Sequence, residues 1–480
     1  MEPAGGAVAK PHFSRAAFHE NFMRATLTDR TGAAWCEGVF SALQNQLSRP
    51  AVRTAVHNLG WLLAERAVRF VLVVVVGFFV ARHLGPARLG SLSYCTAVVT
   101  LAGGVVALGL DELVKRALLR APGEAGELLA SSAVLRLGAA VLAYVGLLAA
   151  GFAHWLGPGE EPRLLAIVGL LLFQPAWLVP DLWLQAHLRA KYSVWAQTGA
   201  LAAGAALRIF LIATDAPLAG FAAALAVEAA LAGAGIHLLA RGAGLRLSWA
   251  AARVATMRRL LAEAWPLISA GLAIVIYMKI DEVMLRLLAG PAAVGIYAAA
   301  TRLTEIWYFV PVALATSLLP ALLRAQAAGG AAYRGRMQQY YDVSAGAAYA
   351  LSVPMALAAP WIVRAAYGEA FAAAGPIVAV HIWSSVFVFV GVARGQWLVN
   401  ERLQIFYLVA TLAGAAVNIA LNFVLIPRWA GLGAAVATVV SQALAAWLSS
   451  FCLAATREAG RMQTRALLVP VLGWAHFRRG

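Results

Sequence analysis

Apolar stretches of membrane-spanning length recur along the chain from about residue 60 to residue 455. An α-helix needs about 20 residues to cross the hydrocarbon core of a bilayer. The stretches that meet this length are 61–82, 91–114, 130–152, 163–187, 195–214, 217–240, 263–288, 293–323, 341–364, 376–399, 404–426 and 431–455. The pattern predicts an all-α, polytopic membrane protein of about 12 transmembrane helices.

The polar connections between these stretches are short, except for one that divides the chain in two. The connection at 215–217 leaves no room for an extramembrane domain, whereas 241–262 separates six stretches from six. We expect five segments along the chain. They are a cytoplasmic N-terminal extension (1–57), an N-terminal six-helix bundle (58–240), a cytoplasmic linker (241–262), a C-terminal six-helix bundle (263–456) and a cytoplasmic tail (457–480).

An internal repeat supports this division. The segment LGPARLGSLSY at 84–94 recurs as AGPAAVGIYAA at 289–299, and ALLRA at 117–121 recurs at 321–325. The repeat aligns a Gly-Pro pair and a following glycine, namely Gly85, Pro86 and Gly90 with Gly290, Pro291 and Gly295. Because each half has an even number of spans, the halves share one orientation and form parallel repeats around a central cavity. In transporters built this way, the substrate binds between the halves.

Composition excludes a water-soluble fold and nucleic-acid binding. The chain is 62% hydrophobic and 12% charged, whereas soluble domains carry about 25% charged residues. Its net charge of +16 comes from basic residues concentrated between alternate apolar stretches, which is the pattern of cytoplasmic loops that face anionic lipid. We therefore expect a multi-pass protein of the bacterial inner membrane with both termini in the cytoplasm.

Motifs for enzymatic or nucleotide-driven activity are absent from the sequence. The three cysteines, Cys36, Cys95 and Cys452, have no metal-ligand spacing and give no disulfide framework. No phosphate-binding loop of the G-x-x-x-x-G-K-[ST] type and no H-E-x-x-H motif occurs. The chain is therefore not expected to be an enzyme or to hold a cofactor, and an ion gradient must drive any transport.

Charged residues lie inside several of the predicted spans. The cations are Arg66, Arg69, Arg136, Arg208, Lys279 and Arg302, and the acids in or near the spans are Glu65, Asp111, Asp181, Glu228, Asp281, Glu282 and Glu305. Six cations facing lipid would cost roughly 15 to 20 kcal/mol, which exceeds a typical folding stability of about 5 to 15 kcal/mol. These side chains must therefore pair, extend to the interface, or line a hydrated cavity.

Two interpretations of the charges remain open. Spacing along the helices allows the local pairs Glu65 with Arg69, Lys279 with Glu282, and Arg302 with Glu305. A polar cavity between the halves is favoured for the set as a whole, because the charges cluster on the first span of each half and on 293–323. Asp181 and Arg136 lie near span ends, so we expect them to extend to the interface.

Cations in such a cavity suit an anionic ligand, and a diphosphate matches the forked donors of arginine. We expect Arg66, Arg69, Lys279 and Arg302 to bind substrate. Carboxylates in the same region can bind a proton or Na⁺ as the coupling ion, and the candidates are Asp281, Glu305 and Glu228. Competition between ion and substrate for two conformations would produce alternating access.

Several motifs together resemble the bacterial polysaccharide and O-antigen flippases, which are lipid-linked oligosaccharide flippases. They are ARHLGPARLG at 81–90, LGLDELVKRALL at 108–119, YMKIDEVML at 277–285, VGIYAAATRLTEIWYFVP at 294–311 and NIALNFVLIPRWAGLGAAVAT at 418–438. The similarity covers about 57–456. It implies the multidrug/oligosaccharidyl-lipid/polysaccharide exporter superfamily, whose members have two six-helix bundles around a central cavity.

The resemblance also implies a function and a set of residues. Members of this family move undecaprenyl-diphosphate-linked oligosaccharide units to the periplasmic leaflet for polysaccharide biosynthesis. The resemblance singles out Lys279, Asp281, Arg302 and Glu305. Arg66 and Arg69 match the family's basic cavity. Expected partners are the lipid-linked oligosaccharide, a proton or Na⁺, membrane lipids and polysaccharide assembly proteins.

Two other functions compete with this one. A multidrug or organic-cation antiporter of the same superfamily would need an acidic cavity, and the number of cations argues against it. A membrane polymerase or ligase that acts on lipid-linked sugars would need a sizeable external catalytic loop, and the sequence contains none. The resemblance does not fix the identity of the sugar.

Overall fold

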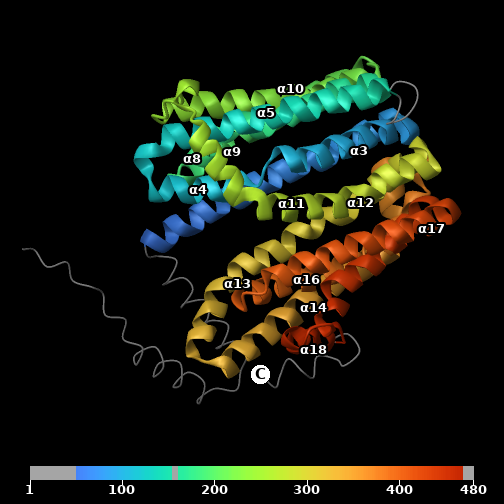
Figure 1. Ribbon diagram of the computed structural model, residues 1–480. Helices are drawn as coiled ribbons and strands as arrows, with labels where there is room; N and C mark the ends of the chain where they lie inside the picture. Colours follow the sequence, from blue (N-terminus) through green and yellow to red (C-terminus); the bar gives the residue numbers. More distant parts are fainter. Residues whose placement is uncertain (1–49, 154–160, 469–480) are drawn as a thin grey trace, which may run out of the picture. The chain divides into compact units, whose positions relative to one another are not determined.

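The computed structural model describes residues 50–153 and 161–468. Within these ranges every regular element is helical, as predicted. The α-helices of the first half are α3 (Pro50–Val106), α4 (Leu110–Arg120), α5 (Ala125–Phe152), α6 (Glu161–Val168), α7 (Gln174–Trp177), α8 (Val179–Ala186), α9 (Ala190–Ala213) and α10 (Leu218–Gly242). Those of the second half are α11 (Val254–Ala289), α12 (Pro291–Glu305), α13 (Phe309–Ala328), α14 (Gly330–Tyr367), α15 (Ala374–His381), α16 (Ser384–Asn400), α17 (Gln404–Ala446) and α18 (Arg457–Leu467) (Figure 1).

Short 3₁₀ helices connect several of these elements. They are η1 (Pro122–Glu124), η2 (Gly169–Phe173), η3 (Trp249–Ala251), η4 (Ile306–Tyr308), η5 (Glu369–Phe371), η6 (Leu448–Phe451) and η7 (Ala454–Thr456). The chain divides into two compact units, residues 1–70 and residues 71–480. The second unit contains both Gly-Pro pairs of the sequence repeat.

The helices account for the predicted membrane spans. In the described ranges, nine helical segments are long and apolar enough to cross a membrane, and a tenth, α11, meets the same test but bends by 55°. Two of the segments are 49 and 48 residues long, and they contain backbone breaks at Gly85 and at Ala430. A straight helix of 49 residues would measure about 73 Å, more than twice the thickness of a bilayer core of about 30 Å. Each of these two segments is therefore long enough to cross the membrane twice. With each counted as two spans, the described segments agree with the prediction of about 12 transmembrane helices.

The sequence repeat is also a structural repeat. Gly85 has φ 70° and ψ 172°, and Gly290 has φ 85° and ψ 176°. Only glycine adopts this conformation readily, because it has no Cβ. The proline after each glycine, Pro86 or Pro291, suits the first turn of the next helix, where its missing N–H is not needed. The same turn therefore occurs in both halves, at what we call the Gly-Pro end of the protein.

At the Gly-Pro end the two halves touch backbone to backbone. A Cβ atom on Gly90 would overlap the carbonyl oxygen of Pro291 and lie 2.8 Å from the backbone nitrogen of Gly295. A Cβ atom on Gly295 would in turn overlap the carbonyl oxygen of Pro86 and lie 2.9 Å from the nitrogen of Gly90. The contact is reciprocal, as expected for parallel repeats related by an axis along the membrane normal.

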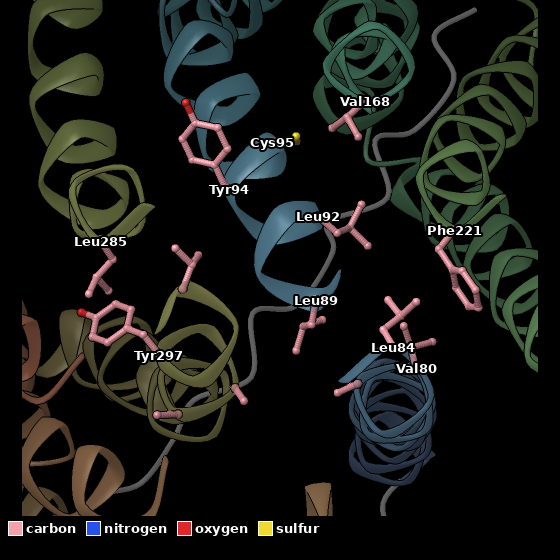
Figure 2. Packing of buried hydrophobic residues seen from close by; sticks show 14 of the residues in the cluster. Val80, Leu84, Leu89, Leu92, Tyr94, Cys95, Val168, Phe221, Leu285 and Tyr297 are labelled. Atoms are coloured by element: carbon pink, nitrogen blue, oxygen red, sulfur yellow. The ribbon is translucent and has the colours of Figure 1, made fainter. Parts of the chain in front are cut away.

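Apolar side chains from both halves surround this contact. Figure 2 shows Leu84 and Leu89 of the first half in the same buried cluster as Leu285 and Tyr297 of the second half. These four side chains are 6% exposed or less, and Leu89 and Leu285 are fully buried. The cluster thus joins the halves at the Gly-Pro end through the hydrophobic effect as well as through close glycine packing.

Two predicted spans of the first half are interrupted. The helix after Gly85 ends at Val106, and α4 begins after Leu108 (φ 53°) and Gly109 (φ 56°), both in the left-handed region. The span predicted at 163–187 consists of α6, η2, α7 and α8. Pro175 and Pro180 stand in the first turns of α7 and α8, where proline restarts a helix but cannot continue the preceding one.

The second half carries a buried arginine that was not among the six cations predicted within spans. Arg394 on α16 is 2% exposed and donates to the carbonyl oxygen of Ala445 at 2.7 Å and to the hydroxyls of Ser449 (2.7 Å) and Ser450 (3.1 Å). Gln463 on α18 binds the same region, because its Nε2 donates to the carbonyl oxygen of Ala446 at 2.8 Å. The C-terminal end of α17 has unsatisfied carbonyls and a partial negative charge, which this guanidinium offsets.

Candidate functional site

Asp281 on α11 is the centre of a buried polar cluster. It is 3% exposed. Its Oδ2 accepts hydrogen bonds from the hydroxyls of Tyr297 and Thr438, both at 2.7 Å, and its Oδ1 accepts one from Nδ2 of Asn422 at 2.7 Å. All three donors are neutral. Among the residues that the structure describes, no lysine or arginine forms an ion pair with this carboxylate.

Further oxygen atoms lie next to this carboxylate. The Nδ2 of Asn422 also donates to Oδ1 of Asn418 at 3.1 Å, whereas Oδ1 of Asn422 is buried without a hydrogen-bond partner. The hydroxyls of Tyr277 and Ser441 lie 3.1 Å apart, and Ser441 donates to the carbonyl of Thr438 at 3.0 Å. We call Asp281, Tyr297, Asn418, Asn422 and Thr438 the Asp281 cluster.

The chemistry of the Asp281 cluster suits a small cation. A buried carboxylate without a positive partner is costly, and in proteins it is neutralised by a proton or by a bound ion. Carboxylate, amide and hydroxyl oxygens are hard ligands that suit hard cations. The unpartnered Oδ1 of Asn422 is a further acceptor in the same place. The cluster can therefore hold one positive charge.

Three helices, α11, α12 and α17, and a break in α17 assemble the Asp281 cluster. Asn418 and Asn422 lie four residues apart on α17, which places their side chains on one face. This part of α17 packs against α11, which carries Asp281 (Figure 1). Thr438 comes from the part of α17 beyond the break at Ala430. The sequence identified only the aspartate; the spacing Asn-x-x-x-Asn in an apolar helix was the available signal for the rest.

Of the local pairs predicted for helices 263–288 and 293–323, one forms. Nζ of Lys279 lies 2.8 Å from Oε1 of Glu282, which confirms that pair. Arg302 and Glu305 form no ion pair among the described residues; Arg302 is exposed and Glu305 is half-buried. Glu305 is the last residue of α12, and the 3₁₀ helix η4 follows it directly.

Arg302 instead lines a cavity where the two halves meet, and the other described lining residues all belong to the first half. The cavity has a volume of about 230 Å³, and its other charged side chains are Arg208 and Glu228. Nη2 of Arg208 lies 2.6 Å from Oε2 of Glu228. The remaining wall is mostly apolar, and it includes Val76 and Phe221. Since Arg208 and Glu228 neutralise each other, the cavity keeps one positive charge, on Arg302.

At the Gly-Pro end, polar links join the halves. Arg286 on α11 forms a forked pair with Glu161 on α6, with Nε to Oε1 at 2.6 Å and Nη2 to Oε2 at 2.9 Å. Both side chains are largely buried, at 15% and 5% exposed. Arg82 donates to the carbonyl oxygens of Ala365 and Ala366, the latter at 3.0 Å. This end is therefore closed in the present conformation.

Other predicted residues fall outside these contacts. Arg66 and Arg69 lie on α3, but their side chains are outside the described residues, as is the side chain of Glu65. The expectation that Arg136 and Asp181 extend to the interface is wrong, because they are buried, at 2% and 7% exposed. Both line a second cavity at the interrupted helices of the first half.

Three buried charged residues were not predicted from the sequence, namely Glu161, Arg286 and Arg394. Glu161 and Arg286 are 125 residues apart in the chain. Nothing in the local pattern around either residue indicates the other, because their pairing depends on how the two halves pack. Arg394 lies inside an apolar stretch, and its position there was the available signal.

Comparison with known proteins identifies a family and a fold. Residues 55–326 match the sequence profile of a family described as polysaccharide biosynthesis protein. No curated protein matches the chain. An inward-facing multidrug resistance transporter of the MATE family and the MOP superfamily is similar in structure, with a TM-score of 0.63 and 14% identity over 83% of this chain and 95% of that one.

Two further solved structures are similar. The lipid II flippase MurJ in an inward closed conformation gives a TM-score of 0.62 at 11% identity, over 84% of this chain and 90% of that one. A MOP superfamily transporter from Pyrococcus furiosus gives 0.57 at 15% identity, over 84% and 94%. At these identities the likeness concerns the fold, which is that of a polytopic, all-α membrane protein.

Proposed function

Because the chain belongs to the polysaccharide biosynthesis protein family, we propose that it is a secondary transporter that flips undecaprenyl-diphosphate-linked oligosaccharide units across the inner membrane by alternating access. The observation that carries this proposal is the cavity between the halves, in which Arg302 is the one uncompensated charge among the described lining residues. One structural neighbour is a lipid II flippase, which is consistent with a lipid-linked substrate.

The diphosphate of the substrate binds Arg302. Two unit charges about 4 Å apart attract by about 4 kcal/mol at the effective dielectric constant of about 20 typical of pairs near a protein surface. Lys279 is the second cation of the proposal, and it would have to exchange its contact with Glu282, at 2.8 Å, for the diphosphate. Arg66 and Arg69 stay sequence-based predictions as substrate ligands, because their side chains are outside the described residues. The cavity of about 230 Å³ is below the range of about 300 to 1,000 Å³ of drug-sized sites, so it must widen to admit a sugar.

The coupling ion binds the Asp281 cluster. A proton or Na⁺ on Asp281 removes the uncompensated negative charge to which Tyr297 and Thr438 donate. Glu305 and Glu228 are secondary candidates, because Glu305 is near Lys279 and Glu228 is already paired with a cation.

Two helices link the ion to the substrate. On α11, Asp281 follows Lys279 by two residues, and on α12, Arg302 follows Tyr297 by five. Each of these helices thus carries one residue of the ion cluster and one cation of the proposed substrate site. An ion that binds one arrangement of α11 and α12 more tightly than the other stabilises the conformation that contains it. This difference in ion affinity couples the two sites, and the ion gradient supplies the free energy for the cycle.

Export of organic cations fits the cavity less well. The one carboxylate among its described lining residues, Glu228, is paired with Arg208 at 2.6 Å. A cationic drug would have to compete with Arg208 and would meet the positive charge of Arg302. A flippase for a lipid diphosphate needs a positively charged cavity, whereas an exporter of organic cations needs a negatively charged one. The charge of the cavity therefore distinguishes the two functions.

The test is the transfer of a lipid-diphosphate sugar between the leaflets of vesicles that contain the purified protein. We expect Arg302→Gln to lower the rate by about tenfold or more, because it removes one charge-assisted contact to the diphosphate. The matched control is Arg364→Gln, since Arg364 is exposed and pairs with exposed Glu369. Equal rates for Arg302→Gln and the wild type would reject Arg302 as a substrate ligand.

A further inference from the structure

A second polar cavity lies in the first half, where two helices are interrupted. Its volume is about 250 Å³. Ala107, at the break between α3 and α4, and Leu178, at the break between α7 and α8, both line it. Membrane proteins tolerate broken helices where the backbone is buried in protein or lines a water-filled cavity, and in transporters such breaks form ion and substrate sites.

The charges of this cavity can be assigned pair by pair. Arg136 on α5 is held by Asp111 on α4, with Nη2 to Oδ1 at 2.6 Å, and Nη1 of Arg136 donates to the carbonyl oxygen of Pro175 at 3.0 Å. Nζ of Lys115 on α4 lies 2.6 Å from Oε1 of Glu112. Each cation that lines the cavity is therefore paired with a carboxylate on α4.

Asp181 on α8 is the carboxylate that remains. Its Oδ2 accepts a hydrogen bond from Nε2 of Gln185 at 2.8 Å. Its Oδ1 is buried and has no hydrogen-bond partner, and no described lysine or arginine forms an ion pair with the carboxylate. The side chain is 7% exposed. The cavity thus carries one uncompensated negative charge at a buried, unpartnered oxygen.

We propose that Asp181 is a cation-binding site of the first half, which takes a single positive charge in the form of a proton or a monovalent metal ion such as Na⁺. Besides the carboxylate of Asp181, the oxygen atoms available as cation ligands in the cavity are those of the Gln174 and Gln185 side chains and the carbonyl oxygen of Pro175. A divalent ion would leave an excess positive charge beside Arg136 and Lys115, so the charge balance selects a monovalent one.

The neighbouring elements supply no further charge to the cavity. The charged groups that line it besides Asp181 are Asp111 and Lys115 from α4 and Arg136 from α5. α7, α9 and α10 also pack against α8 but contribute no charged lining residue. Arg136 is in contact with Asp111 at 2.6 Å, and although its Nε has no partner, its single positive charge cannot compensate both carboxylates.

This site is separate from the Asp281 cluster and does not rest on the proposed function. Asp181 lies in the first half and Asp281 in the second, and they share no hydrogen-bond partner. If both sites bind, each half of the protein carries one buried carboxylate that needs a cation, and a transport cycle can move two charges.

The experiment is carbodiimide labelling of Asp181 in the purified full-length protein, with the labelled peptide measured by mass spectrometry. A carbodiimide reacts with a protonated carboxyl group, so labelling reports the proton-bound state. If Na⁺ is a ligand, sodium chloride lowers the labelling at constant pH, whereas choline chloride at the same concentration does not.

Two variants show that the signal comes from Asp181 itself. Asp181→Asn must abolish labelling of this peptide, and Asp281→Asn must leave it unchanged. Protection by Na⁺ at constant pH identifies a metal-ion site. Labelling that persists to a higher pH than at exposed Asp215, with no effect of Na⁺, identifies a proton site; either result supports the proposal. Labelling at Asp181 that is absent or constant from about pH 5 to about pH 9, with and without Na⁺, would overturn it. That outcome would mean that Arg136 neutralises Asp181 permanently.

Discussion

Replacing Gly90 by alanine tests the contact between the two halves at the Gly-Pro end. In this conformation the added Cβ would overlap the carbonyl oxygen of Pro291 and lie 2.8 Å from the backbone nitrogen of Gly295. Non-bonded heavy atoms prefer about 3.5 to 4.0 Å, so the two backbones must separate by on the order of 1 Å. The neighbouring atoms belong to backbone and cannot move aside as a flexible side chain would.

The expected destabilisation of this closed conformation is about 1 to 3 kcal/mol, the usual cost of overpacking a well-packed site. Since about 1.4 kcal/mol is a factor of ten, the ratio of this conformation to the alternatives falls by about 5-fold to about 150-fold. Gly295→Ala should act in the same way through Pro86. One separation of the backbones relieves both overlaps, so the double variant should cost less than the sum of the two.

The assay is a distance distribution between spin labels on either side of the contact. Suitable positions are Ala87 and Ala292, which are equivalent in the repeat and exposed, in a background without the native cysteines. The control is Gly138→Ala on α5, because a Cβ there would meet no atom within 4 Å. We expect a longer distance in Gly90→Ala and no change in the control. Identical distributions in all three proteins would refute the contact.

Three further predictions concern stability and topology. Glu161→Gln should destabilise the closed conformation by about 3 to 5 kcal/mol, because it leaves Arg286 largely buried without its carboxylate partner. In a thermal unfolding measurement, the double variant that exchanges Glu161 and Arg286 should recover part of this loss of stability. Arg394→Met should lower the midpoint of thermal unfolding more than Arg394→Lys, because methionine leaves the carbonyl of Ala445 and two serine hydroxyls without their donor; equal midpoints would contradict a structural role for the guanidinium. A cysteine at exposed Asp215 should react with an impermeant reagent in intact cells and one at exposed Arg246 should not, and labelling of the second would reverse the orientation.

Local sequence patterns were sufficient to predict the fold class and the repeat. Long apolar stretches predict membrane helices, because a helix that crosses lipid must satisfy its own backbone and present an apolar surface. The Gly-Pro pairs predicted the repeat, and their shared backbone conformation at Gly85 and Gly290 explains why glycine and proline stand there. These are local properties, and a sequence displays them directly.

The site was only partly predictable, because its residues come together from distant parts of the chain. Asp281 could be named from its position inside a span, but Asn422 and Thr438 are 141 and 157 residues away from it. Which polar residues meet depends on the packing of α11 against α17, and a hydropathy pattern does not encode that register.

Interrupted helices caused the error at Arg136 and Asp181. The expectation that they extend to the interface rested on their nearness to the ends of the predicted spans 130–152 and 163–187. The neighbouring span 91–114 was likewise predicted as one continuous helix. The left-handed residues Leu108 and Gly109 end one helix within the span, and the breaks around α7 interrupt the other. The side chains are consequently buried around an internal cavity.

The central claim is that an ion at the Asp281 cluster drives the movement of a lipid-diphosphate sugar. The most direct measurement is the rate of transfer between leaflets in vesicles with an imposed Na⁺ or pH gradient. We expect one of these gradients to accelerate the wild-type protein. Asp281→Asn keeps the shape of the side chain and removes its charge, so its rate should be the same with and without that gradient, and Lys279→Ala should abolish transfer while the protein stays folded. A wild-type rate that is indifferent to both gradients, or a fully active Lys279→Ala variant, would contradict this mechanism.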